Sequence, residues 1–321
     1  MGILLLMPIP AIALLLVSSL HAASLTAEAP LEVPGGAGHF DFMNIDVTNR
    51  LVFACHPGKS SFAVVDLKNG SVKDVDAGVP VNGICPDPDG HRVFAAGPGK
   101  ALVCFDTHTW EKKGSLPLDG PGDCVQFDTK RGVVYVDNDD GTNLWVVDPA
   151  GMKLKGAVTI KEAPEYMEVD QGRGKIFQAI KSTATVQVID IETMKVTAEW
   201  SLGELKSPHG LAEDRTTGRI FVVGKNGKLV ILDAESGKTV GNVEVVKNSD
   251  QIAYDQELKR LYIPGESKIQ IVQIDGDSGS VAGSVPVDKD CHRVTVDTTN
   301  HDIWVAYATA DKSFVQKFTA K

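Results

Sequence analysis

Short apolar runs alternate with polar turns along most of the chain, in a pattern that repeats at steps of 41 to 44 residues. Each unit carries an aspartate a few residues before an aliphatic or aromatic run, such as Leu-Val-Phe-Ala from Leu51. A second apolar run follows and usually ends in another aspartate, as at Asp66 and Asp233. The seven repeated aspartates are Asp46, Asp87, Asp128, Asp170, Asp214, Asp255 and Asp297. About four strands per unit of this length are typical of a propeller blade, so the pattern predicts an all-β, seven-bladed β-propeller.

The last unit has no segment for an outer strand. It supplies Val294–Asp297, Ile303–Tyr307 and Phe314–Phe318 and nothing more. A spare strand-like segment, Leu25–Val33, precedes the first unit. Because an open ring would leave strand edges unpaired, we expect the N-terminal segment to complete the last blade and close the ring. Residues 24–321 are therefore predicted to form one domain.

The first 23 residues differ from the repeats. The stretch from Ile3 to Val17 is almost entirely apolar and is followed by small residues. This composition predicts a secretory signal peptide cleaved between Ala22 and Ala29, and hence a periplasmic or secreted protein with no stable membrane span after cleavage. An uncleaved membrane anchor is the alternative, which the shortness of the run disfavours, since a span needs about 20 apolar residues.

The net charge and the cysteines indicate which class of partner and which disulfides to expect. The formal net charge is −10 and Lys and Arg are scattered, which disfavours binding to nucleic acid. The five cysteines show no pair suited to a disulfide, and we expect Cys55, Cys85 and Cys104 to be buried free thiols. The expected protein is a monomer that binds a small molecule or another protein.

A ring of polar residues precedes the first strand of every unit. Counting back five residues from each repeated aspartate gives Asp41, Asn82, Asp123, Glu165, His209, Asp250 and His292. Two positions further on, all residues are apolar: Met43, Ile84, Val125, Met167, Leu211, Ile252 and Val294. We expect the polar ring to lie at one mouth of the central channel, above an apolar wall. The alternative is a ring of solvated side chains without a ligand.

The ring suggests two kinds of cation site. His209, Asp250 and His292 come from three consecutive units, and two imidazoles with a carboxylate suit zinc or another transition metal. The other arc is rich in oxygen and suits calcium. The residues predicted to bind a ligand are Asp41, Asn82, Asp123, Glu165, His39 and Arg293. A nucleophilic pair of a cysteine (Cys124 or Cys291) with a histidine is a weaker alternative.

The repeat resembles that of the YVTN-repeat, YncE-like bacterial propellers. The resemblance rests on segments such as Gly218–Val223, Leu232–Lys238 and Asn49–Ala54, and it extends over all seven units. It implies the propeller fold, but no particular activity. A shorter segment, Val81–Ile84 followed by Pro88-Asp89-Gly90, is similar to the metal-binding Asn-Gly segment of gluconolactonase and senescence-marker propellers.

Two functions remain open at this point. The first is a binding module that recognises a protein or small ligand, with or without a divalent metal, through the mouth of the channel. The second is a metal-dependent, lactonase-like hydrolase or lyase, in which Asp250 or Glu165 acts as the general base.

Overall fold

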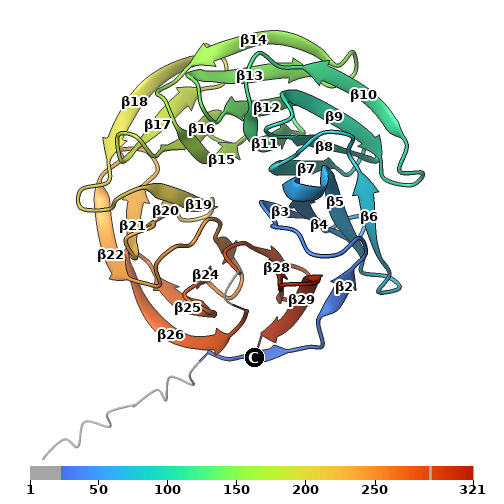
Figure 1. Cartoon of the computed structure of the whole chain (residues 1–321). Helices are drawn as coiled ribbons and strands as arrows, with labels where there is room; N and C mark the ends of the chain where they lie inside the picture. The colour runs from blue at the N-terminus through green and yellow to red at the C-terminus, as the bar shows by residue number, and fades with distance from the viewer. Residues whose placement is uncertain (1–22, 289–290, 321) are drawn as a thin grey trace, which may run out of the picture.

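Seven antiparallel sheets are arranged in a ring, as expected for a seven-bladed β-propeller (Figure 1). The computed structural model describes residues 23–288 and 291–320. The predicted signal peptide therefore lies almost wholly outside the described residues. Within the described part, no helix is long and apolar enough to cross a bilayer.

Each blade runs from an inner strand beside the channel to an outer strand at the rim. The first three blades consist of β3 (Met43–Asp46), β4 (Leu51–His56), β5 (Ser61–Asp66), β6 (Val72–Asp76); β7 (Gly83–Asp87), β8 (Arg92–Ala96), β9 (Ala101–Asp106), β10 (Lys112–Pro117); and β11 (Gly122–Asp128), β12 (Val133–Asn138), β13 (Asn143–Asp148), β14 (Lys153–Thr159). The next two are β15 (Pro164–Asp170), β16 (Lys175–Ile180), β17 (Thr185–Asp190), β18 (Lys195–Ser201); and β19 (Pro208–Asp214), β20 (Arg219–Gly224), β21 (Lys228–Asp233), β22 (Thr239–Glu244). The sixth is β23 (Ala253–Asp255), β24 (Arg260–Gly265), β25 (Lys268–Asp275), β26 (Ser278–Pro286), and the seventh contains β27 (Val294–Asp297), β28 (Asp302–Ala308) and β29 (Ser313–Ala320). A short 3₁₀ turn, η1 (Pro57–Lys59), joins β4 to β5.

The repeated aspartates are buried and close the turn between the first two strands of each blade. Asp46 Oδ1 accepts a hydrogen bond from the Asn49 backbone N–H at 2.8 Å, and Asp128 Oδ1 accepts one from the Arg131 N–H at 3.0 Å. An arginine often neutralises the same carboxylate, as in the Arg131–Asp128 pair at 3.0 Å. The aspartate repeat therefore serves the fold, because a side-chain oxygen bonded to the backbone a few residues later fixes a tight turn.

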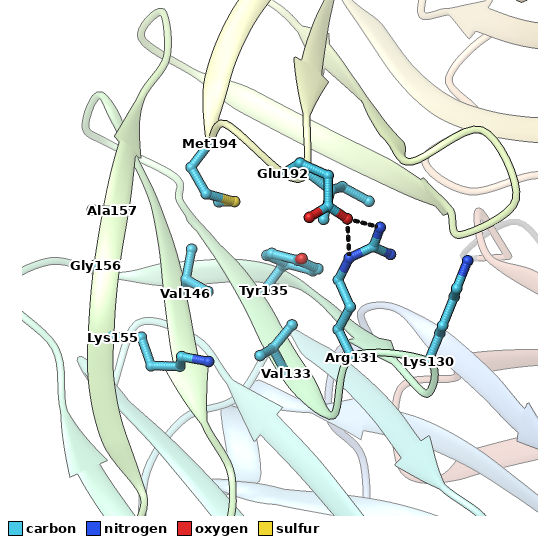
Figure 2. A pocket seen from close by; sticks show the side chains of 11 residues that line it. Lys130, Arg131, Val133, Tyr135, Val146, Lys155, Gly156, Ala157, Glu192 and Met194 are labelled. Atoms are coloured by element: carbon cyan, nitrogen blue, oxygen red, sulfur yellow. Dashed lines mark hydrogen bonds and ion pairs between the residues drawn. The ribbon is translucent and has the colours of Figure 1, made fainter.

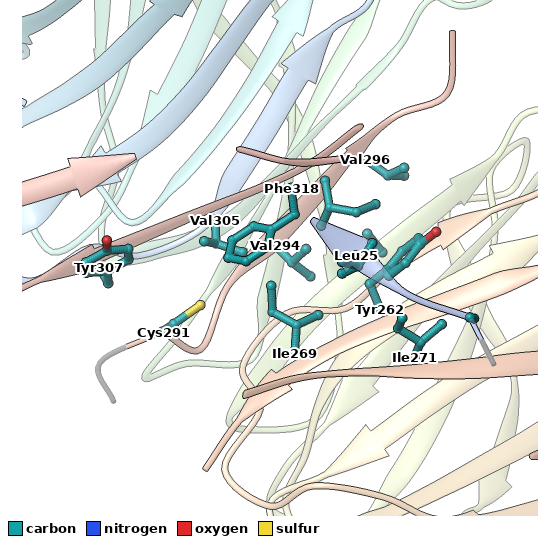
Figure 3. Packing of buried hydrophobic residues seen from close by; sticks show 13 residues of the cluster. Leu25, Tyr262, Ile269, Ile271, Cys291, Val294, Val296, Val305, Tyr307 and Phe318 are labelled. Carbon is teal, nitrogen blue, oxygen red and sulfur yellow. The ribbon is translucent and has the colours of Figure 1, made fainter. Parts of the chain in front are cut away.

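The ring closes as the sequence predicts. Strands β1 (Leu25–Ala27) and β2 (Leu31–Val33) both pair antiparallel with β29, and Leu25 lies opposite Ala320. Figure 1 shows β2 beside β29 near the C-terminus. Leu25 packs in one cluster with Phe318 and Tyr262, which belong to the last two blades (Figure 3). The first and last parts of the chain thus share one blade, which removes the open edge.

The apolar ring behind the mouth does not form the predicted channel wall. Met43 packs with Val52 and Trp304 between the first and last blades, and Leu211 packs with Phe177 between the fourth and fifth. The prediction assumed that residues two apart point to one face. A shift of register follows the mouth residue in several blades, for example between Pro164 and Met167. Because a bulge adds a residue to the strand, side chains on its two sides no longer point as simple alternation predicts. The apolar residues therefore point into the space between blades and not into the channel.

The five cysteines are buried free thiols. This confirms the expectation for Cys55, Cys85 and Cys104, which pack in the apolar layers of the first two blades.

Candidate functional site

Three side chains close the channel below its mouth, and we call them the channel plug: Phe42, Tyr166 and Gln251. The rings of Phe42 and Tyr166 meet edge to face with centroids 5.4 Å apart, although they come from the first and fourth blades. The Gln251 amide reaches from the sixth blade to the backbone of Met43, where it accepts from N–H at 2.9 Å and donates to C=O at 2.8 Å. The plug therefore separates the residues at the mouth from the rest of the channel, and we call the mouth region above the plug the cup.

Most of the predicted ring residues meet in this cup. Asn82 Nδ2 donates a hydrogen bond to Asp123 Oδ1 at 3.1 Å. Arg293 Nη2 lies 3.0 Å from Asp250 Oδ2 and 3.6 Å from Asp41 Oδ1, so one guanidinium joins the seventh blade to its two neighbours.

The other predicted residues lie nearer the rim of the cup. His39 is exposed, and its Nε2 lies 3.5 Å from Arg293 Nη2. His292 donates from Nδ1 to the backbone oxygen of Asn248 at 2.8 Å. Both imidazoles therefore border the cup.

Further charged residues enter the cup from the turn after the second strand of a blade, and the sequence reasoning missed them. Lys181 forms an ion pair with Glu165, and Lys225 forms one with Asp250. Asp139 occupies the corresponding place in the third blade. Each of these three residues lies eleven positions after a repeated aspartate. Comparing this second position across the repeats would therefore have found them. Adjacent antiparallel strands place the end of one beside the start of the other, which brings both registers to one mouth.

We call the assembled group the mouth cluster: Asp41, Asp123, Asp137, Asp139, Glu165, Lys181, His209, Lys225, Asp250 and Arg293. Its six carboxyl groups outnumber its three basic side chains, Lys181, Lys225 and Arg293.

The acidic half of the mouth cluster is strongly desolvated. Burial raises the pKa of Asp123 well above its usual range, and the neighbouring charges of Asp41 and Asp137 raise it further. The pKa of Asp137 is also raised by burial, although its carboxylate accepts hydrogen bonds from the Cys124 N–H at 2.7 Å and from Gln178 Nε2 at 3.1 Å. Burial likewise raises the pKa of Asp41, partly offset by Arg293. Each carboxylate thus lacks enough positive charge nearby for its ionised form.

The opposite half contains groups that titrate near neutral pH. Burial raises the pKa of Glu165 to about 7, against the favourable effect of Lys181. Burial and the charge of Lys225 lower the pKa of His209 to about 3, so this imidazole is neutral. His209 donates from Nδ1 to the Ser207 carbonyl at 3.0 Å, which leaves Nε2 as an acceptor 3.4 Å from Glu165 Oε1. Burial and Arg293 lower the pKa of Lys225 to about 8.

The raised pKa of Glu165 predicts a pH-dependent contribution to stability. The folded state holds a proton on Glu165 up to about pH 7, whereas the unfolded chain releases it near 4.5. Stability is therefore lost as the pH rises through this window, by about 3 kcal/mol. We expect Glu165→Gln to gain about 3 kcal/mol relative to wild type between pH 4.5 and 7.5 in urea unfolding. The exposed Glu111→Gln should follow wild type, and parallel pH profiles for wild type and Glu165→Gln would contradict the assignment.

The predicted transition-metal triad is not brought together in this structure. Asp250 is held by Lys225 and Arg293, His209 faces Glu165, and His292 is bonded to the Asn248 backbone. Across residues 23–288 and 291–320, no three His, Cys, Asp or Glu side chains are grouped so that they could hold a metal ion. Zinc or calcium binding stays a prediction and is included in the titrations below.

The thiol near the mouth is poorly suited to nucleophilic attack. Burial and the Asp137 carboxylate hold the pKa of Cys124 well above its usual range. Its sulfur accepts the Met167 N–H at 3.5 Å. Because the thiolate is the nucleophilic form, the arrangement disfavours the cysteine–histidine alternative at this position.

Comparison with protein-family models and with curated proteins finds no match. Solved structures match over almost the whole chain. Hydrazine synthase from Kuenenia stuttgartiensis aligns with a TM-score of 0.76 and 14% identity, covering 87% of this chain and 94% of the other. The WD40 repeats of RRP9 align with a TM-score of 0.80 and 9% identity, covering 93% of this chain and 100% of the other. A chain of the mitotic checkpoint complex aligns with a TM-score of 0.77 and 12% identity, covering 98% of each chain. At these identities the likeness concerns the fold alone, and it establishes a seven-bladed β-propeller.

Proposed function

We propose that this chain is a ligand-binding propeller whose mouth cluster binds a small organic cation. The observation that carries the proposal is the excess of desolvated carboxyl groups gathered at the mouth, above the channel plug. Asp41, Asp123 and Asp137 all have raised pKa values because burial and neighbouring carboxylates oppose their ionisation. A positive ligand between them would supply the missing countercharge, which makes binding favourable.

The arrangement favours an organic ammonium over a bare metal ion. A metal needs several donors converging within about 2.0 to 2.6 Å of one point. The carboxylates of the cup come from the first, third, fourth and sixth blades, and no three-ligand group is assembled among the described residues. An ammonium group with an organic body is larger and can contact such separated carboxylates together. The plug residues Phe42 and Tyr166 would limit how deeply it enters.

The proposed setting is outside the cytoplasm. Residues 1–23 carry the composition of a signal peptide. Ala23 and Leu25 are buried in the last blade. Cleavage at the early end of the window, before Ala23, would keep this blade intact.

Thermal shift and calorimetry on the described chain test the proposal. The probes are tetramethylammonium, 1,4-diaminobutane, calcium chloride and zinc chloride at pH 7.5, each with sodium chloride at matched ionic strength. We expect one of the organic cations to raise the melting temperature. Asp123→Asn should weaken its binding at least about tenfold, because one carboxylate contact of this kind contributes about 1.5–3 kcal/mol. Binding should also weaken as the pH falls and the carboxyls with raised pKa take up protons.

The exposed Asp76→Asn on the outer strand β6 is the matched control and should bind as wild type does. If only calcium or zinc raises the melting temperature, the ligand of the mouth cluster is a metal ion and not an organic cation. If no cation stabilises wild type beyond the sodium chloride control, the mouth cluster is not a cation site.

One observation favours the second function, acid–base catalysis by a hydrolase or lyase. Glu165 has a pKa of about 7 and lies 3.4 Å from the neutral His209, so it can hold or release a proton near neutral pH. Lactone and ester substrates assayed with wild type and Glu165→Gln distinguish this function from binding alone. Turnover that disappears in Glu165→Gln would support it, and absence of turnover in wild type would leave the binding function.

A further inference from the structure

A groove of about 640 Å³ is lined by residues of the third and fourth blades, and no residue of the mouth cluster lines it (Figure 2). Its apolar floor consists of Val133, Tyr135, Val146, Ile191 and Met194. Its rim carries Lys130, Arg131, Lys155 and Glu192. We call this feature the interblade groove.

The interblade groove exists because one glycine is left uncovered. Gly114, Gly156 and Gly241 occupy the same register on the outer strands of the second, third and fifth blades. The next blade fills the space over two of them: a β-carbon on Gly114 would lie 2.6 Å from Met152, and one on Gly241 would collide with the Asp277 carbonyl. A β-carbon on Gly156 would meet nothing within 4 Å. The third blade thus departs from the repeat at this position and leaves a hollow.

The two lysines of the groove rim are not engaged by acidic side chains of the described chain, whereas the arginine is. Arg131 is occupied by Asp128 and by Glu192, whose Oε1 lies 3.1 Å from Arg131 Nε. Lys130 and Lys155 form no ion pair with any residue that the structure describes. Tyr135 also lines the groove, and burial raises the pKa of its hydroxyl to about 12, so the hydroxyl keeps its proton and can donate a hydrogen bond.

The groove is therefore locally positive on a protein whose net charge is −10. The ammonium groups of Lys130 and Lys155 border the apolar floor, and Tyr135 adds a hydroxyl to it. This arrangement matches a ligand that carries carboxylates on either side of an apolar group. Strand β14 borders the groove and is the outer strand of its sheet, so its far edge pairs with no other strand of that sheet. An extended chain can lie along such an edge.

We propose that the interblade groove binds an extended acidic peptide segment of a partner protein. One apolar side chain of the peptide lies over Tyr135 and Val146 in the hollow at Gly156. Its flanking carboxylates contact Lys130 and Lys155, and one of them accepts a hydrogen bond from the Tyr135 hydroxyl. This site is separate from the mouth cluster and does not depend on the function proposed for it.

Fluorescence anisotropy with a defined set of labelled nonapeptides tests the inference. The peptides carry Leu, Met, Phe or Trp at the centre, flanked by Asp and Glu. Matched peptides carry Lys in place of the acidic residues or Ala in place of the apolar one. We expect at least one acidic, apolar peptide to bind wild type and both kinds of matched peptide to bind at least about tenfold more weakly, because each loses one half of the recognition. Binding should also weaken with added salt.

Variants of the groove supply the decisive comparison. Gly156→Met fills the hollow without backbone strain, since the position has no left-handed φ and open space above it, and it should reduce affinity at least about tenfold. Lys155→Glu should have a similar effect and Tyr135→Phe a smaller one. Gly58→Met, another open position far from the groove, and Asp123→Asn in the mouth cluster should bind as wild type does. If no peptide binds wild type more tightly than Gly156→Met, or if the lysine peptides bind equally well, the inference is wrong.

Discussion

A chain that starts at residue 34 is expected to melt about 10 °C or more below a chain that starts at residue 23. The shorter chain loses β1 and β2, which both pair with β29. It also loses the buried side chains of Leu25 and Val33 and exposes the cluster around Phe318. Burial of two such side chains and of the apolar surface beneath them is worth about 5 kcal/mol, and a protein of this size loses about 2 °C per kcal/mol.

A pair of substitutions in β1 separates closure of the ring from a general effect of shortening. Leu25 faces the last blade, whereas Thr26 is exposed. Leu25→Asp should destabilise the protein by about 3 kcal/mol or more, since it removes buried apolar surface and adds a charge. Thr26→Asp should change the melting temperature little. Equal melting temperatures for the chains that start at residues 23 and 34, measured by circular dichroism, would refute closure by the terminal strands.

Arg293→Met is expected to be the most damaging single substitution in the mouth cluster, at about 3–5 kcal/mol in urea unfolding at pH 7.5. The Arg293 side chain is only 8% exposed and is the cation nearest to Asp41 and to Oδ2 of Asp250. Removing it takes the nearest cation from Asp41 and leaves Asp250 with Lys225 alone, which costs more than the pair contributes.

The sign of the pH dependence tests this explanation. Arg293 lowers the pKa of Asp41, which burial otherwise raises above 3.8. Without Arg293 the folded state holds the Asp41 proton more strongly, so stability falls further as the pH rises above 4. The loss in Arg293→Met should therefore shrink towards pH 4. Lys228→Met, at the start of β21, should show little loss at either pH, because Lys228 pairs only with the exposed carboxylates of Glu204 and Glu244. A loss in Arg293→Met that is independent of pH would assign Arg293 a packing role instead of an electrostatic one.

The sequence predicted the parts of the structure that depend on local signals. Each repeated aspartate accepts hydrogen bonds from its own turn, as Asp46 does from Asn49, so seven such signals predict seven blades. The missing outer strand of the last unit and the spare segment Leu25–Val33 predicted the closure for an equally general reason, because sheet edges need partners. Counting back five positions from each repeated aspartate also identified most residues of the cup, because equivalent positions of different blades lie at the same mouth of the channel.

The contacts between different blades could not be predicted by comparing one position across the repeats, and only the tertiary structure shows them. The plug unites Phe42, Tyr166 and Gln251 from the first, fourth and sixth blades, and only closure of the ring brings them within contact. Bulges at the start of the inner strands turned the expected apolar wall into packing between blades. Lys225 reaches Asp250 from the turn after the second strand of a neighbouring blade, so the pairing that occupies the predicted metal ligand could not be read from one register.

The sequence by itself thus determined the number of blades, their turns and the ends that close the ring. These features follow from hydrogen bonds and apolar periodicity within one unit. The tertiary structure alone decided the charge balance of the cup and the hollow at Gly156. Both arise where neighbouring blades meet, and side-chain contacts there depend on distances and burial that a repeat pattern does not contain.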